Sequence, residues 1–232
     1  MTTQAALAQD KSVTVRPTPG TSIASRLLPL LVPLLLVLIN VRIVMSPLWL
    51  QIEYHRPGFP IDPFGFTLQD RLTYAPYAID YLIYNHDLSY LGDLTFPNGL
   101  PLYNERELKH MYDVQVVTQW AFIIALAAGV IASACALLLW RRDRARLWVA
   151  LRVGALLTLG GIVGIILFAL VGWDVFFTGF HNVFFENGTW YFLTSDTLIR
   201  LFPEQFWFDT AIVIGGLSAL QAGFLYLILR RR

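Results

Sequence analysis

The sequence predicts an all-α membrane protein with four transmembrane helices and two extracytoplasmic loops that contain short amphipathic helices. Hydrophobic residues make up 56% of its 232 residues and charged residues 14%, whereas soluble domains average about 45–50% and about 25%. Four apolar runs each reach the roughly 20 residues that a helix needs to cross a bilayer. The net charge of +1 provides no basic field for nucleic acid. We therefore expect a multi-pass protein of the plasma membrane.

The chain begins with a polar segment, residues 1–25, that we expect to be a disordered cytoplasmic tail. Residues 26–232 are expected to form a single integral membrane domain. Its first span covers about 27–50 and carries Arg42 near the outer end. Two interpretations of Arg42 stay open: its side chain extends to the headgroups, or it is an intramembrane cation that faces a bound substrate.

The first outer loop, residues 51–113, is expected to contain one helix over 67–85. Apolar residues recur there at helical spacing, and Thr67 with Asp70 resembles a capping box. This helix is expected to lie on the membrane surface or to cap the bundle.

The second and third spans, about 114–140 and 147–171, are joined by the basic segment 141–146. Such a short connection makes the two helices an antiparallel hairpin, so we expect their outer ends to be neighbours. Gly160 and Gly164 form a GxxxG pattern in the third span, which permits close helix approach.

A second outer loop, residues 172–209, is rich in aromatic residues, and the fourth span covers about 210–229. The short segment 141–146 holds four arginines and one aspartate, and the chain ends in three arginines. The second outer loop instead holds more acids than bases. Because short cytoplasmic segments are enriched in Lys and Arg, both termini are expected to be cytoplasmic and both long loops extracytoplasmic.

Two histidines stand out at the outer ends of spans. His110 lies in the charged stretch NERELKHMYDV, where the second span begins, and His181 lies in the aromatic stretch FHNVFF beyond the third span. The hairpin is expected to bring them together. Glu107 and Asp113 lie three positions on either side of His110, on the same helix face. Each is a candidate to bind one imidazole nitrogen and fix the tautomer.

A histidine pair suits acid–base chemistry, with one ring as general base and the other as general acid or electrostatic stabiliser. Neither histidine has a serine or cysteine beside it in the sequence, so a covalent nucleophile is not indicated. No CxxC or HExxH motif indicates a metal site, and no cofactor is expected. The other histidines, His55 and His86, are interpreted as solvated loop residues. The aromatic residues around His181 suit acyl chains, although such residues also serve as ordinary interface anchors.

Three segments resemble a known family of bacterial membrane proteins: FTLQDRL…IDYLIYN, NERELKHMYDV and FHNVFFENGTWYF…DTLIRLFPEQFWFD. Their order, their spacing and the four-span plan are similar to those of the lipoprotein intramolecular transacylase (Lit) family over about residues 26–230. The resemblance implies an enzyme that moves the sn-2 acyl chain of a diacylglyceryl-cysteine lipoprotein to the α-amine of the same cysteine, which gives a lyso-form lipoprotein. Membrane lipids and a diacylated lipoprotein are the implied partners.

The resemblance also implies residue roles. The two essential histidines of the family correspond to His110 and His181, although which of them is the base stays open. Arg42, Arg106 and Asn182 are candidates for holding substrate carbonyls. Trp190 lies in the matching aromatic segment and is a further supporting candidate.

Two other classes of function are compatible with the residues alone. One is a lipid-ester hydrolase or an intermolecular acyltransferase that uses the same histidines. The other is a non-catalytic membrane scaffold, for which alanine at both histidines leaves function intact. A transporter is disfavoured because the spans lack acidic relays and broken polar helices.

Overall fold

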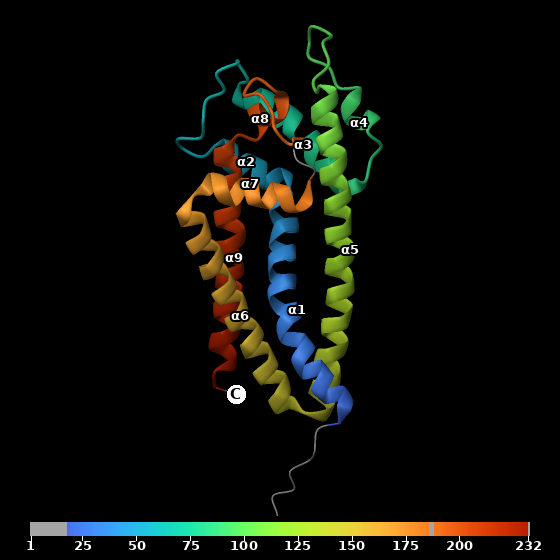
Figure 1. Cartoon of the computed structure of the whole chain (residues 1–232), viewed down its shortest axis with the longest axis vertical. Coiled ribbons are helices and arrows are strands. Elements are labelled where there is room, and N and C mark those ends of the chain that lie inside the picture. The colour runs from blue at the N-terminus through green and yellow to red at the C-terminus, as the bar shows by residue number, and fades with distance from the viewer. Residues whose placement is uncertain (1–17, 186–187, 232) are drawn as a thin grey trace, which may run out of the picture.

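The structure is a computed structural model that describes residues 18–185 and 188–231 (Figure 1). Within these residues, four helices are long and apolar enough to cross a membrane, so the predicted all-α membrane fold is confirmed. These helices are α1 (Pro19–Val44), α5 (Glu105–Arg142), α6 (Arg144–Val171) and α9 (Glu204–Leu229). The shorter helices are α2 (Pro47–Tyr54), α3 (Leu68–Tyr84), α4 (Ser89–Gly92), α7 (Trp173–Phe184) and α8 (Thr197–Leu201).

The first span begins and ends earlier than expected. Thr18 caps α1 through its side chain, and a proline occupies the first turn, where its missing N–H costs nothing. Residues 19–25 are therefore helical and do not belong to a disordered tail, whereas residues 1–17 lie outside the described part. The helix ends at Val44 because Ser46 precedes a proline and is extended, with φ of −149°.

The other spans contain the predicted ranges and extend beyond them. Helix α5 begins nine residues before the expected 114 because Asn104 and Glu107 form a capping box. Helix α6 is capped by the side chain of Asp143, and α9 begins directly after Pro203. The predicted helix at 67–85 is confirmed as α3, whose capping box is formed by Thr67 and Asp70.

Helix α1 packs against α5, α6 and α9 at the centre of the bundle, and buried alanines and leucines form its contacts with α5 and α6. Gly154 of α6 is the closest approach among the described glycines: a Cβ there would lie 2.7 Å from Cβ of Val32 on α1. Gly160 and Gly164 have no atom within 4 Å of such a Cβ. The GxxxG pattern therefore does not mark a close helix contact, because α6 has left α1 at that height.

A polar cluster inside the bundle joins α1 to α9. The side chain of Asn40 is fully buried and donates to Oγ of Ser218 at 2.9 Å and to Oε1 of Gln221 at 2.8 Å. Gln221 returns a hydrogen bond to Asn40 at 3.2 Å. Such bonds stabilise helix pairs in lipid because few other partners exist there.

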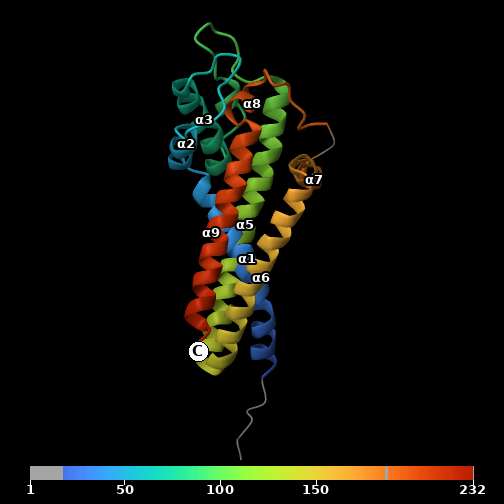
Figure 2. The same cartoon turned by 90° about the vertical axis from the view of Figure 1, so that its left-hand side faces the viewer.

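A compact cap, residues 47–103 together with 193–203, covers the outer end of α1 and packs beside the outer turns of α5 and α9 (Figures 1 and 2). Its buried charged groups bind backbone carbonyls or an opposite charge. The guanidinium of Arg71 donates to the carbonyls of Arg200 at 3.0 Å and Pro60 at 2.7 Å. Arg200 forms an ion pair with buried Asp62 at 3.0 Å and lies 3.6 Å over the ring of Phe66. These bonds fix the loops of the cap on one another.

Helices α5 and α6 diverge from their short connection, so their outer ends are not the neighbours that the hairpin predicts (Figure 1). The chain turns at Gly172, and α7 then crosses from the end of α6 towards α5. Figure 2 shows α7 nearly end-on, standing off one side of the bundle. The packing of α6 on both α1 and α9 explains its tilt. The crossing helix α7, rather than the hairpin, carries the second histidine back to α5.

Candidate active site

His110 lies in the second turn of α5, where the helix passes the cap. Its side chain is 9% exposed, and the rings of Phe185 and Phe192 contact it edge-on at centroid distances of 5.0 and 5.2 Å. Nδ1 of His110 is among the buried atoms of the described residues that have no hydrogen-bond partner. His110 is thus a nearly enclosed imidazole with one unpaired ring nitrogen.

His181 lies near the C-terminal end of α7. Its Nδ1 is 2.8 Å from the carbonyl oxygen of Phe177, one helical turn earlier. A carbonyl only accepts hydrogen bonds, so Nδ1 carries the hydrogen and the neutral ring keeps its lone pair on Nε2. The rings of Phe177 and Trp190 contact this imidazole at centroid distances of 4.1 and 4.7 Å. Burial among these rings lowers the pKa of His181 from its usual 6.5, although the Phe177 carbonyl partly offsets this effect.

The two imidazole rings face one another across the site. Their centroids are 6.4 Å apart and their planes differ by 21°. Ring nitrogens lie about 1.2 Å from a centroid, so nitrogens of the two rings are at least about 4 Å apart, beyond the range of a hydrogen bond. The structure therefore brings the two predicted histidines together without a direct bond between them.

Glu107 does not bind either imidazole. Its carboxylate accepts hydrogen bonds from the backbone N–H of Asn104 at 2.8 Å and of Leu198 at 2.7 Å. The first bond completes the cap of α5, and the second ties α5 to α8. The predicted bond from Glu107 to His110 is therefore not formed, because both oxygens serve the backbone. Asp113 is half-buried and is not bonded to Nδ1 of His110, so its supporting role stays a prediction.

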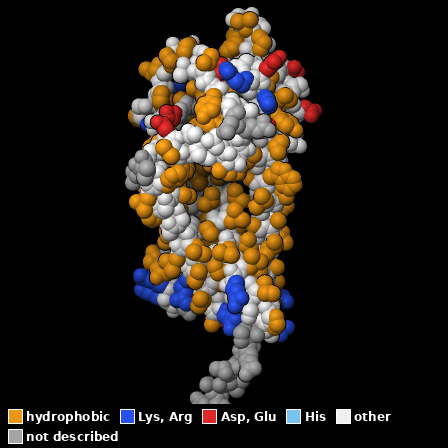
Figure 3. All heavy atoms as spheres, in the orientation of Figure 1, with side chains coloured by type: hydrophobic (Ala, Val, Ile, Leu, Met, Phe, Trp, Pro, Cys, Tyr) orange, Lys and Arg blue, Asp and Glu red, His pale blue; other side chains and the backbone are white. Residues whose placement is uncertain are grey.

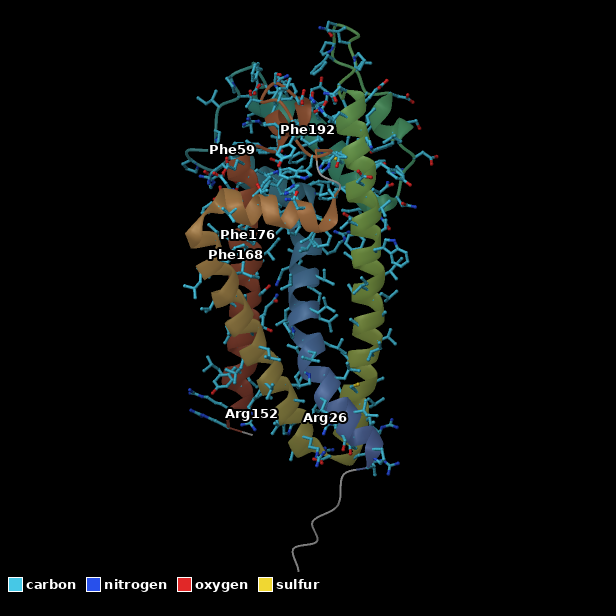
Figure 4. All side chains as sticks on the ribbon, in the orientation of Figure 1. Arg26, Phe59, Arg152, Phe168, Phe176 and Phe192 are labelled. Carbon is cyan, nitrogen blue, oxygen red and sulfur yellow. The ribbon has the colours of Figure 1, made fainter. Side chains whose placement is uncertain are left out.

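Arg106 holds the segment that follows α7 against α5. It forms an ion pair with Asp196 at 2.8 Å, and its guanidinium lies 5.8 Å over the ring of Phe192. Phe192 in turn contacts His110, and Figure 4 shows its ring above α7. In this structure Arg106 therefore positions a wall of the site, and its predicted contact with a substrate carbonyl stays a prediction.

The remaining candidates differ in their distance from the histidines. Trp190 is 7% exposed and packs on His181, and its Nε1 has no partner among the described residues. Asn182 follows His181 on α7 and is exposed. Arg42 lies in the last turn of α1, donates to the carbonyl of Met45 at 3.1 Å and lies 6.0 Å from the ring of Phe122 on α5. Both interpretations of Arg42 stay open.

Of two walls of the site, Phe185 is one of the aromatic residues around His181 that the sequence indicates for acyl chains, whereas Phe192 is not among them. Both belong to an irregular segment, where no periodicity indicates which way a side chain points. The density of aromatic residues between 184 and 192 was the only available signal, and it does not distinguish a wall of the site from an interface anchor.

Comparison with known proteins places this geometry in a family. The family model for the lipoprotein intramolecular transacylase Lit matches residues 26–207, more than three-quarters of the chain. The chain belongs to the Lit family. It is therefore an acyltransferase and a multi-pass membrane protein. An uncharacterised protein of Aquifex aeolicus is 30% identical over 196 residues, which cover 84% of this chain and 88% of that protein.

Solved structures of Lit from Bacillus cereus share the fold. One superposes with a TM-score of 0.76 at 19% identity and covers 91% of this chain and 94% of the other. A variant of the same protein with a histidine-to-arginine substitution gives a TM-score of 0.72 at 19% identity, with 91% of each chain covered. The arrangement of spans and cap is thus that of the membrane-integral Lit fold.

Proposed function

We propose that the protein moves the sn-2 acyl chain of a diacylglyceryl-cysteine lipoprotein to the α-amine of that cysteine, with His181 as general base and His110 as hydrogen-bond donor. The observation that carries this proposal is the pair of facing imidazoles, 6.4 Å apart within an aromatic enclosure. The donor ester and the acceptor amine lie on one molecule, so positioning supplies much of the rate enhancement.

The tautomers favour this division of roles. Nδ1 of His181 is committed to the Phe177 carbonyl, which leaves Nε2 as an acceptor for the amine proton. The lowered pKa of His181 keeps the ring neutral at pH 7, as a base requires. Nδ1 of His110 is buried without a partner, and a buried N–H without a partner is rarer than an unpaired acceptor. We therefore place the hydrogen of His110 on Nε2, from which it can donate.

The proposed reaction conserves every atom of the substrate. The amine nitrogen bonds to the ester carbonyl carbon, and the oxyanion that forms accepts a hydrogen bond from His110. Nε2 of His181 takes one proton from the nitrogen. The bond between the carbonyl carbon and the glyceryl sn-2 oxygen then breaks, and His181 returns the proton to that oxygen. The product is an amide and a free glyceryl hydroxyl of unchanged total mass.

The surroundings of the site suit a lipid substrate. Helix α7 has no fully buried residue, and it presents large exposed side chains such as Val183 and Phe180. Beneath α7 the surface is hollowed between α6 and α5, and hydrophobic side chains surround the hollow (Figure 3). An acyl chain can reach the histidines there from the hydrocarbon region. Basic residues gather at the opposite end of the bundle (Figure 3), so by the charge rule the site is extracytoplasmic.

The test uses a synthetic diacylglyceryl-cysteine lipopeptide, incubated with purified protein and analysed by tandem mass spectrometry. Wild type is expected to place one acyl chain on the α-amine with total mass unchanged. His110→Ala and His181→Ala are each expected to lower the rate by at least about 100-fold. His55→Ala is the matched control, because Nδ1 of His55 makes the same bond to a carbonyl one turn earlier, at 2.7 Å, but at an exposed position.

Several outcomes distinguish the alternatives. Release of free fatty acid by wild type identifies a hydrolase, and full activity of both alanine variants identifies a scaffold role for the histidines. His110→Gln retains an N–H donor and is expected to keep more activity than His110→Ala, whereas His181→Gln removes the base. If His181→Gln retains activity and His110→Gln does not, the roles assigned to the two rings are reversed.

A further inference from the structure

A recess of about 690 Å³ lies at the end of the bundle opposite the histidines, where α5 and α6 are joined. It is lined by Leu137, Trp140, Arg141, Arg142, Asp143 and Arg144. Both helices are membrane spans that end at this connection, so the recess lies at the boundary between hydrocarbon and headgroups. Figure 3 shows Lys and Arg side chains gathered at this end, whereas the visible acidic side chains lie at the other.

The recess keeps an excess of positive charge. Its one acid, Asp143, forms an ion pair with Arg146 at 2.9 Å and caps α6. Arg141 and Arg142 are exposed, and no acidic side chain in the described part of the chain pairs with them. Their guanidinium groups are therefore available to an anion, and guanidinium groups bind phosphate through parallel N–H bonds.

One side of the recess is apolar and ordered. The guanidinium of Arg144 lies 4.5 Å over the ring of Trp140 and donates to the Trp140 carbonyl at 3.2 Å. Trp148 closes on the same ring edge-on at 5.6 Å. Leu137 lies one helical turn deeper on α5. Apolar surface therefore adjoins the arginines on the side of the hydrocarbon region. A ligand with a phosphate and an acyl chain, such as a phospholipid, fits this arrangement better than a free phosphate ion.

We propose that this recess binds the headgroup of an anionic phospholipid. The phosphate contacts Arg141, Arg142 and Arg144, and one acyl chain lies along Trp140 and Leu137. The proposal does not depend on the chemistry at the histidines, because the two sites lie at opposite ends of the bundle. Lipid bound here would contact both α5 and α6 at the point from which they diverge.

The experiment titrates delipidated full-length protein in detergent with dioleoylphosphatidylglycerol and counts bound lipids by native mass spectrometry. Dioleoylphosphatidylcholine and inorganic phosphate are run as separate arms. The double variant Arg141→Gln/Arg142→Gln is expected to bind the anionic lipid about 25-fold more weakly, since each arginine near a bilayer surface contributes roughly fivefold. The matched control is Arg230→Gln/Arg231→Gln, which removes the same charge from exposed positions outside the recess.

The expected result is a tight first phosphatidylglycerol that survives in the control and is lost in the recess variant. An equal loss in both double variants shows a diffuse charge effect and overturns the proposal. Displacement of the lipid by millimolar inorganic phosphate identifies a simple anion site and also overturns it, as does equal binding of phosphatidylcholine. Thermal unfolding of each variant in detergent confirms that the comparison is made on folded protein.

Discussion

The cap and the crossing helix α7 lie side by side, yet the buried charged groups of the cap have partners, whereas buried ring nitrogens beside α7 do not. In the cap, buried Arg71 and Asp62 are fully engaged with carbonyls or with an opposite charge. Around α7, Nδ1 of His110 and Nε1 of Trp190 are buried without partners, and α7 itself has no fully buried residue. The hydroxyls of Tyr81 and Tyr103 in the cap are also buried without partners among the described residues, so the difference concerns the charged groups of the cap and the ring nitrogens beside α7. The element that must admit a substrate is the one that the fold holds least firmly.

Helix α6 shows the same contrast along its own length. Its inner half approaches α1 so closely at Gly154 that a Cβ meets Val32. Its outer half, at Gly160 and Gly164, has open space around those positions. Helix α6 is therefore tightly packed on α1 in its inner half and loosely packed in its outer half, which leads into α7.

The largest effect is expected from Glu107. Its carboxylate binds the N–H of Leu198 in the cap, and it precedes His110 by three positions on α5. Glu107→Ala removes the partners of two backbone N–H groups, those of Asn104 and Leu198. An unsatisfied buried donor costs about 1–3 kcal/mol. Because the bond to Leu198 is buried and the bond to Asn104 only partly so, we expect the free energy of unfolding to fall by about 2–4 kcal/mol. Thermal unfolding in detergent measures this loss.

The matched control is Glu105→Ala, an exposed acid in the same first turn of α5. Glu105 interacts only with the helix dipole, so Glu105→Ala is expected to lower the free energy of unfolding by about 0.3–1 kcal/mol. Equal destabilisation by the two variants would show that Glu107 acts through its charge alone and not as a clamp between α5 and α8.

Two glycines of α6 test the contrast within one helix. Gly154→Ala places a methyl group 2.7 Å from Cβ of Val32, and overpacking of this kind costs about 1–3 kcal/mol. Gly160→Ala meets open space, so the higher helix propensity of alanine is expected to stabilise it by up to about 1 kcal/mol. The two unfolding temperatures should move in opposite directions; movement in the same direction would refute the difference in packing.

The smallest effect concerns the pH profile. Burial lowers the pKa of His181 from 6.5, so this base becomes protonated only below pH 6.5. Below its pKa, the transfer rate is expected to fall about tenfold per pH unit. The sign for stability is the same: the unfolded chain binds this proton more readily, so the stabilisation present above pH 6.5 is lost as the pH falls. Rates of acyl transfer measured between pH 4.5 and 8 show where the acid limb of the pH profile, the region of falling rate, begins.

Phe177→Ala sharpens this measurement. It keeps the backbone carbonyl that binds Nδ1 but removes a ring 4.1 Å from the imidazole, so the acid limb is expected to move up towards pH 6.5. Phe64→Ala, which changes an exposed ring of the cap, leaves the limb in place. A limb that does not move in Phe177→Ala rules out burial as the cause of the shift.

Hydropathy was enough to predict the four spans, because length and apolar composition are properties of each segment alone. The caps at Thr67 and Asn104 are equally local, because each is formed by residues three positions apart. The course of α7 was not predictable, since it depends on how α6 packs against α1 and α9. The predicted proximity of His110 and His181 is therefore observed, but α7 and not the hairpin is its cause.

Glu107 shows a second limit. Its spacing from His110 is correct for a contact on one helix face, but its oxygens bind Leu198, 91 positions away in the chain. Spacing within a helix gives the possible partners of a side chain, and only the tertiary structure decides between them. The GxxxG pattern failed for the same reason.

The unbroken length of α5 has a consequence for the membrane in which the protein works. His110 and Arg142 lie on the same helix, 32 residues or about 48 Å apart along its axis. A bilayer with its headgroups is about 40–45 Å thick. When the arginines at one end of α5 are anchored at one membrane surface, the rigid helix holds His110 at a fixed distance, or height, from that surface. Lipids of a different chain length shift the ester groups relative to that height, so we expect the rate of the proposed transfer to depend on the thickness of the bilayer.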